Sequence, residues 1–234
     1  AERRVGDFVP RGLSNIAWTF ATLGQAEAQL FMLLAKETKR HVSDFDPWGL
    51  ANTAWAFATL GQSDVKLFAA LGRAATWCVR DFKVQGLANT AWAFATASSS
   101  DAQVFAALAR AAELRLSDFN VQALANTAWA LAMAAQSDAE LFRALARAAG
   151  WCVGDFHAQD LANTAWAFAT LGQSDVKLFE ALGRAATWFV GDFNVQGLAN
   201  TAWSFATASS SDAQVLAALA RAAELRLSSF NVQA

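Results

Sequence analysis

One leucine recurs every 37 residues along almost the whole chain, and no insertion or deletion separates its copies. It occupies positions Leu13, Leu50, Leu87, Leu124, Leu161 and Leu198. Strict repetition at this period is typical of stacked supersecondary units, none of which can bury its apolar face alone. The chain is therefore predicted to be an array of near-identical repeats with no central active-site cleft.

The third repeat shows the predicted local structure most clearly. Leu87 and Phe94 fall on one face of a helix predicted over 84–97. The segment Ser98-Ser99-Ser100-Asp101 breaks this helix and caps a second one, whose apolar face includes Val104 and Leu108. The predicted fold class is all-α, an α-solenoid of stacked two-helix hairpins with a right-handed superhelix.

Composition and helix-start residues agree with this class. Hydrophobic residues make up 55% of the chain, enough to bury a large apolar surface. The two prolines, Pro10 and Pro47, fall in the first turn of a predicted first helix, where the missing N–H has no partner to lose. Asp46 and Asn120 are good N-cap residues at the same helix start.

The repeat period divides the chain into a single solenoid segment over 1–234. Six full repeats are predicted at 8–44, 45–81, 82–118, 119–155, 156–192 and 193–229, with partial repeats at both ends. Residues 59–66 recur at 170–177, so a three-repeat block is predicted to have been duplicated. We expect both ends to lie inside a longer array, with any leader or partner domain outside this segment.

Several function classes have little support. The formal charge of −2 gives no general affinity for nucleic acid, and no apolar run is long enough for a membrane helix. Cys78 and Cys152 lie two repeats apart, beyond disulfide reach, while His41 and His157 are isolated. We therefore expect no enzyme, no cofactor, no metal site, no small-molecule substrate and no membrane insertion.

A polar stripe runs along the first helix, opposite the apolar face. In the third repeat it comprises Gln85, Asn89, Trp92 and Thr96, spaced to share one side of a helix. The Asn position is invariant among the repeats: Asn15, Asn52, Asn89, Asn126, Asn163 and Asn200. Two interpretations are open, a hydrogen-bonded ladder between repeats or a row of amides facing a ligand. The equivalent tryptophans, Trp18, Trp55, Trp92, Trp129, Trp166 and Trp203, could likewise be inter-repeat core or a stacking surface.

First-turn positions of the first helix vary between repeats, as positions that read a sequence should. The candidate base-contacting side chains there are Arg11, Trp48, Gln85, Gln122, Gln159 and Gln196. They extend from a helix N-terminus, where anions are also favoured. Together with the Asn column they form the candidate RNA-binding site on the base side.

Each second helix carries one basic residue at the same position. This base column is Lys36, Arg73, Arg110, Arg147, Arg184 and Arg221. A regular row of cations suits a phosphate backbone, which makes these residues the candidate RNA contacts on the phosphate side. The competing interpretation pairs them in inter-repeat ion pairs with Asp44, Asp81, Asp118, Asp155 and Asp192. The side of the stack on which the column lies would discriminate between the two.

The wording of the repeat resembles a known family. Residues 85–95, Gln-Gly-Leu-Ala-Asn-Thr-Ala-Trp-Ala-Phe-Ala, followed by Asp101 and the segment 104–108, are similar to the heptatricopeptide and octotricopeptide repeats of organellar RNA-binding proteins. The wording is most similar to proteins of dinoflagellates and their algal and apicomplexan relatives, which often end in a RAP domain. The resemblance implies an α-solenoid that binds single-stranded RNA in plastids or mitochondria.

The leading hypothesis is single-stranded RNA binding by a helical-repeat array in organellar RNA processing, stability, translation or ribosome assembly. The alternative is a protein-interaction scaffold that binds an extended peptide or bridges subunits of a larger organellar ribonucleoprotein. A third possibility is a spacer within a longer array. The predicted partners are therefore single-stranded RNA and protein subunits.

Overall fold

The computed structural model describes residues 9–99, 101–208 and 213–231, and its described residues are almost entirely α-helical. They form stacked helical hairpins, which confirms the predicted all-α class. Ser100 of the predicted interhelix loop and the predicted partial repeats at the chain ends lie outside the described residues, apart from the backbone of residues 230 and 231.

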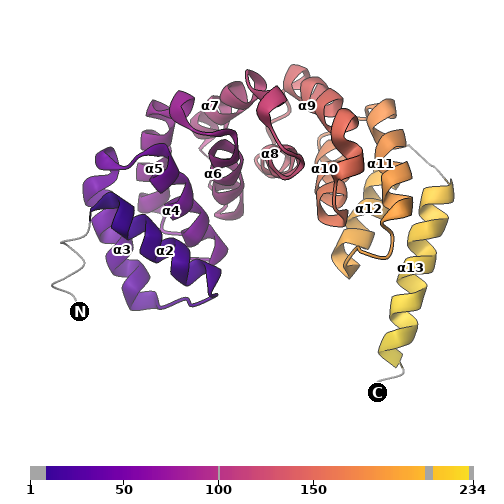
Figure 1. Ribbon diagram of the computed structural model, residues 1–234, viewed down its shortest axis with the longest axis horizontal. Coiled ribbons are helices and arrows are strands. Elements are labelled where there is room, and N and C mark those ends of the chain that lie inside the picture. Colours follow the sequence, from indigo (N-terminus) through magenta and orange to yellow (C-terminus); the bar gives the residue numbers. More distant parts are fainter. Residues whose placement is uncertain (1–8, 100, 209–212, 232–234) are drawn as a thin grey trace. The chain divides into compact units, whose positions relative to one another are not determined.

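Each hairpin contributes one helix to each of two layers (Figure 1). The first helices are α2 (Pro10–Thr22), α4 (Pro47–Thr59), α6 (Val84–Thr96), α8 (Val121–Met133), α10 (Ala158–Thr170) and α12 (Val195–Thr207). The second helices are α3 (Ala28–His41), α5 (Val65–Trp77), α7 (Ala102–Glu113), α9 (Ala139–Cys152), α11 (Val176–Trp188) and α13 (Ala213–Asn231). Short 3-10 turns end four repeats: η1 (Val42–Asp44), η2 (Val79–Asp81), η3 (Leu116–Asp118) and η4 (Val153–Asp155).

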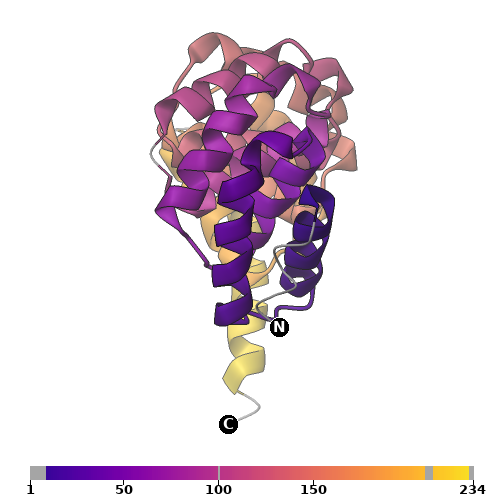
Figure 2. The same cartoon turned by 90° about the vertical axis from the view of Figure 1, so that its left-hand side faces the viewer.

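The chain divides into two compact units, residues 1–115 and 116–234. Unit 1 contains α2 to α7, and unit 2 contains η3 and α8 to α13. The division follows the three-repeat duplication, because each unit holds one copy of the block. In Figure 2 unit 1 is viewed from the side of α2 and α3, where its two layers begin.

Caps and turns fix the helix ends much as the residue types indicate. The Asp46 and Asn120 side chains accept hydrogen bonds from the N–H groups of Gly49 and Ala123, at 2.7 and 2.8 Å. Asp101 caps α7 in the same way, as predicted. The first helix of the third repeat ends at Thr96, one residue before the predicted end.

The turn between the two helices of a repeat passes through the left-handed backbone region. Gly61 adopts a φ of 65° there, and Gly24 and Gly172 do the same. Ser98 and Ala135 occupy the equivalent position with φ of 54° and 53°. Because a side chain is disfavoured at positive φ, these two repeats form the turn at a local energetic cost that the flanking helices compensate.

Small side chains let the first helices pack closely. Ala88, Ala91, Ala93 and Ala95 of α6 are all buried, and equivalent alanines line α4 and α10. Within each unit the first helices lie in closer contact than the second helices. Each unit therefore bends toward the layer of first helices, and the polar stripe lies on that inner side.

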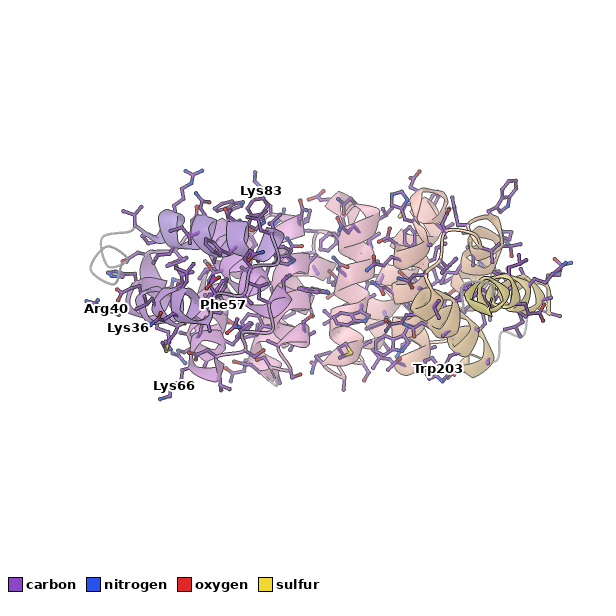
Figure 3. The ribbon with its side chains drawn as sticks, turned by 90° about the horizontal axis from the view of Figure 1, so that it is seen from below. Lys36, Arg40, Phe57, Lys66, Lys83 and Trp203 are labelled. Carbon is purple, nitrogen blue, oxygen red and sulfur yellow. The ribbon has the colours of Figure 1, made fainter. Side chains whose placement is uncertain are left out.

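Phenylalanine rings connect the two layers between successive repeats. The ring of Phe31 in α3 meets that of Phe57 in α4 edge to face, with centroids 5.0 Å apart. Phe68–Phe94, Phe142–Phe168 and Phe179–Phe205 repeat this arrangement at 5.2, 5.0 and 5.4 Å. Figure 3 shows Phe57 in the interior of unit 1, with Lys36 and Lys66 extending outward. Every second helix in these pairs thus packs against the first helix of the next repeat.

At one contact between neighbouring second helices, the two side chains are matched in size. A Cβ added to Gly72 of α5 would lie 2.8 Å from Cγ2 of Val104 in α7, and one added to Gly183 would lie 2.9 Å from Cγ2 of Val215. At the equivalent positions one repeat earlier, Ala35 stands in place of Gly72 and Leu67 in place of Val104. At this contact Gly is therefore paired with Val and Ala with Leu, also at Ala109 with Leu141 and Ala146 with Leu178.

This size pairing predicts a coupled effect on stability. Gly72→Ala is expected to destabilise unit 1, because overpacking costs about 1–3 kcal/mol and Ala gains at most about 1 kcal/mol over Gly in a helix interior. Adding Val104→Leu should recover most of the loss, since the pair then matches Ala35 and Leu67. Urea unfolding of both single variants and the double variant measures the coupling energy. Additive effects would contradict the proposed size matching.

Candidate functional site

The predicted base-side residues of unit 1 gather around one groove on the first-helix face. The groove has a volume of 760 Å³ and crosses α2, α4 and α6. Its lining includes Arg11, Asn15, Trp18, Trp48, Asn52, Gln85 and Asn89. The structure therefore brings together the candidate side chains of three successive repeats.

Contacts within the groove order some of these side chains. The Arg11 guanidinium carbon lies 5.9 Å from the ring centroid of Trp48, a cation–π arrangement between neighbouring repeats. Asp46 and Asp81 also line the groove, together with Lys83. Two carboxylates thus offset the two cations, and the groove of unit 1 carries no net charge.

Unit 2 presents the same stripe in uncharged form. Gln122, Gln159 and Gln196 are exposed at the first turns of α8, α10 and α12. Asn126, Asn163 and Asn200 are half-buried beside them. The rings of Trp129 and Trp166 lie with centroids 6.4 Å apart and planes inclined by 38°. Amides and indoles thus form a continuous face along the first helices of this unit.

The Asn column does not form the hydrogen-bonded ladder that was one of the two interpretations. No hydrogen bond from the side-chain amide of Asn52, Asn89, Asn126, Asn163 or Asn200 is found in the described part of the chain, and the same holds for the exposed Asn15. An amide that donates and accepts but meets no protein partner loses hydrogen bonds when water is excluded. These amides are therefore available to a ligand.

The tryptophans of the stripe are partly buried and partly exposed, so each of the two interpretations holds in part. Trp18 and Trp203 are 45% and 47% exposed, and Trp55, Trp92 and Trp166 are half-buried. Trp18 lines the groove of unit 1. The tryptophans contribute to repeat packing and still offer aromatic surface.

The base column lies on the other side of the stack. On α5, Phe68 points to α6 through its contact with Phe94, and Arg73, about 140° further round the helix, is exposed. All six members are exposed: Lys36, Arg73, Arg110, Arg147, Arg184 and Arg221. The column therefore occupies the outer surface of the second helices, away from the Asn stripe.

The predicted ion pairs between the base column and the Asp series are not observed among the described residues. Asp44 lies 3.6 Å from Nδ1 of His41 in its own repeat. The inter-repeat ion pair in unit 1 is instead Lys39 with Asp64, at 2.8 Å. Burial raises the pKa of Asp64, but hydrogen bonds from Lys39 and the Leu67 N–H outweigh this, and the net pKa lies below the ordinary value.

The residues that could have carried redox, metal-binding or catalytic chemistry have structural roles. Both cysteines are free and half-buried, and each Sγ donates to a backbone carbonyl of its own helix, Ala74 for Cys78 and Ala148 for Cys152. Burial raises the pKa of both thiols, so little thiolate is present at neutral pH. At the start of α10 the Asp160 carboxylate accepts a hydrogen bond from the His157 backbone N–H at 3.1 Å.

The described residues contain neither a metal-binding cluster nor a membrane-spanning helix. No group of three or more His, Cys, Asp or Glu side chains lies close enough to hold a metal ion there. No helix within the described ranges combines the length and the apolar character needed to cross a membrane.

A family model matches nearly the whole chain, from residue 3 to residue 229. It describes RESC6, the RNA-editing substrate-binding complex 6 protein. The chain belongs to the RESC6 family. No curated protein compared with it is significantly similar. The match corrects the resemblance in one respect: the family shown is RESC6, and assignment to the heptatricopeptide or octotricopeptide repeats specifically is not part of it.

Sequence reasoning missed one set of residues on the second helices of this RESC6-family chain. Four positions after the base column stand Trp77, Leu114, Trp151, Trp188 and Leu225, all strongly exposed. Their signal was present in the sequence, because these apolar residues fall outside the apolar face of the helix pattern. We call them the outer apolar row.

Proposed function

We propose that this chain is a non-catalytic scaffold subunit of an RNA-editing substrate-binding complex and that it binds single-stranded RNA along its first-helix face. The observation that carries the proposal is the row of Asn side chains, repeated in every hairpin, whose amides make no hydrogen bond within the described residues. Membership of a family named for an RNA-editing substrate-binding complex supports the choice of ligand.

The chemistry of the stripe suits nucleobases. An Asn or Gln side chain donates and accepts at once, so it can pair with the donor and acceptor groups of a base edge. Single-stranded RNA exposes those edges, and its bases can lie against aromatic side chains. A half-exposed indole beside each amide provides such a surface. One repeat could therefore hold about one nucleotide, as in other helical-repeat RNA binders.

Phosphate recognition on this face would rest on few charges. The cations that line the groove of unit 1 are Arg11 and Lys83, whereas the base column lies on the outer surface of the second helices. RNA bound to the first-helix face would therefore depend on amide and stacking contacts more than on counterion release. This accounts for RNA binding by a chain whose net charge is −2.

An extended peptide is the second candidate ligand for the same groove. The observation that favours it is the lack of net charge, because Asp46 and Asp81 offset Arg11 and Lys83. Side-chain amides can also pair with a peptide backbone, which carries the same donor and acceptor groups. The experiment below distinguishes the two ligands.

Two finer points belong to the proposal as well. The one-nucleotide-per-repeat mode follows the resemblance to heptatricopeptide and octotricopeptide repeats. An organellar location, in a mitochondrion or plastid, follows from the same resemblance. Both would place the chain in organellar RNA processing.

The Asn52→Ala/Asn89→Ala double variant is expected to bind a labelled pool of single-stranded RNA at least about tenfold more weakly, because each lost amide contact is worth about 1 kcal/mol. Fluorescence anisotropy across a salt series measures both affinity and charge. With two groove cations, the slope of log K against log salt should be about −1.4, compared with about −4 for six cations of the base column.

The matched control is Arg73→Ala/Arg110→Ala, which alters two exposed cations on the outer surface of unit 1. RNA affinity and salt slope should remain unchanged in this variant. If instead it flattened a slope near −4, the RNA would lie on the second helices and the proposed site would be wrong. Absence of RNA binding at low salt, with binding of an unstructured neutral peptide, would assign the groove to a peptide.

A further inference from the structure

The outer surface of the second helices carries an exposed apolar row that the proposed function does not use. Trp77, Trp151 and Trp188 are 92%, 90% and 86% exposed. Leu114 and Leu225 hold the equivalent position in the third and sixth repeats. A fully exposed indole can bury about 150–250 Å² on association. Trp151 and Trp188 hold equivalent positions on adjacent second helices of unit 2, so one partner could bury both.

The base column runs alongside this row. Arg73 precedes Trp77 by one helical turn, Arg147 precedes Trp151, and Arg184 precedes Trp188. None of these three guanidinium groups has an ion-pair partner among the described residues, whereas Arg143 is paired with Glu140. Each of these three repeats therefore offers one apolar anchor and one exposed positive charge about 5–6 Å apart along the helix.

Hollows lie beside the row, between neighbouring second helices. One in unit 1 has a volume of 340 Å³ and is lined by Gly72, Arg73, Thr76 and Trp77 of α5, by the α7 N-cap Asp101, and by Gln103 and Val104 of α7. One in unit 2 has a volume of 370 Å³, and its lining includes Arg221, Ala222 and Leu225. Both are bounded by members of the base column and of the outer apolar row. The surface can thus receive inserted side chains as well as present its own.

We propose that, within each unit, the outer apolar row and the base column form a docking surface for a partner protein, which contributes an amphipathic helix with apolar residues flanked by Asp or Glu. Charge complementarity carries the acidic part of this assignment, because no ion pair joins a cation of the column to a carboxylate among the described residues. Apolar anchors with hollows between helices fit a helix that presents side chains at i, i+3 or i+4, and i+7. Trp and Arg are also the residue types that dominate binding energy at protein interfaces.

The composition of the row favours a protein over RNA. A base-stacking position requires an aromatic ring, but Leu114 and Leu225 replace Trp in two of the repeats. Leu fills an apolar contact nearly as well as Trp does, so the exchange preserves a protein interface and abolishes a stacking site. This inference is independent of RNA binding on the first-helix face, because the two surfaces lie on opposite sides of the stack.

The test is a selection of random 16-residue peptides displayed on phage against the whole chain. Enriched peptides should combine apolar residues at helical spacing with Asp or Glu. They should bind at least about tenfold more weakly to Trp151→Ala/Trp188→Ala and to Arg147→Glu/Arg184→Glu. Because these side chains are exposed, thermal unfolding of both variants should match the parent chain. Asn126→Ala/Asn163→Ala, altered on the first-helix face of the same unit, should bind the peptides unchanged.

Three results would overturn the proposal. Enrichment of no peptide, or of peptides without acidic residues, would remove the assigned partner chemistry. Loss of oligouridine binding in Trp151→Ala/Trp188→Ala, with Asn126→Ala/Asn163→Ala unaffected, would assign the surface to RNA. Self-association of the parent chain in sedimentation velocity, lost in the Trp double variant, would assign it to a second copy.

Discussion

Phe57→Ala is expected to lower the free energy of unfolding by about 3–5 kcal/mol, the usual cost of deleting a buried aromatic side chain. The Phe57 ring is 1% exposed and meets Phe31 of the preceding hairpin edge to face. Its removal leaves a cavity at the point where two repeats join. Since repeat stacks are stabilised by neighbour interfaces, this loss is a large share of the roughly 5–15 kcal/mol typical of a folded domain. Urea unfolding followed by circular dichroism measures it.

The array supplies its own control for this substitution. Leu131 occupies the position of Phe57 in the fourth repeat and is equally buried. Phe57→Leu should therefore cost clearly less than Phe57→Ala, because Leu fills most of the space and leaves only a small cavity. Equal losses for Ala and Leu would show that the aromatic contact, and not the filled volume, holds the repeats together.

Trp166→Leu/Trp203→Leu is expected to weaken single-stranded RNA binding at least about 30-fold. Each base stacked on an aromatic side chain is worth about 1–3 kcal/mol, and two such contacts in adjacent repeats would be lost. Trp203 is half exposed at the first-helix face, and Trp166 lies beside Trp129 on the same face. Leu retains much of the apolar packing, so the change isolates stacking. Anisotropy of labelled RNA at low salt measures the loss.

The control for this prediction is the same pair of exchanges on the outer surface. Trp151→Leu/Trp188→Leu removes two indoles that are far more exposed, yet RNA affinity should be retained. Thermal unfolding of both double variants checks that the hairpins remain packed. If the outer pair weakened RNA binding as much as the inner pair, stacking on the first-helix face would be refuted.

The first-helix face and the outer surface of the second helices differ in charge. The first-helix face is uncharged in unit 2 apart from buried Asp160, and balanced in unit 1. The outer surface carries the free cations of the base column. Salt should therefore affect docking of an acidic partner more than it affects RNA affinity, because exposed ion pairs are screened strongly. A scaffold built this way could hold RNA and protein at the same time.

Much of the local structure was predictable from the sequence. Pro47 marks the start of α4, and Asp101 and Asn120 cap the helices they precede. The stripe of exposed Gln85 and half-buried Asn89 follows directly from helical spacing. These features depend on contacts within a few residues, which the order of residues already contains. The left-handed backbone at Ala135 does not follow from its own residue type, because Ala disfavours positive φ; the Gly at the same position of three other repeats is the signal for it.

The sequence by itself determined the helical hairpin, its period, and which residues share a side of each helix. Only the tertiary structure decided whether each side of a helix faces solvent or another helix. The tertiary structure placed the base column on the outer surface and exposed Trp77, Trp151 and Trp188. It also left the Asn amides without a hydrogen-bond partner among the described residues. The physical reason is that periodicity fixes the angle of a side chain around its own helix. Which neighbouring helix contacts that side chain depends on packing between residues about one repeat apart.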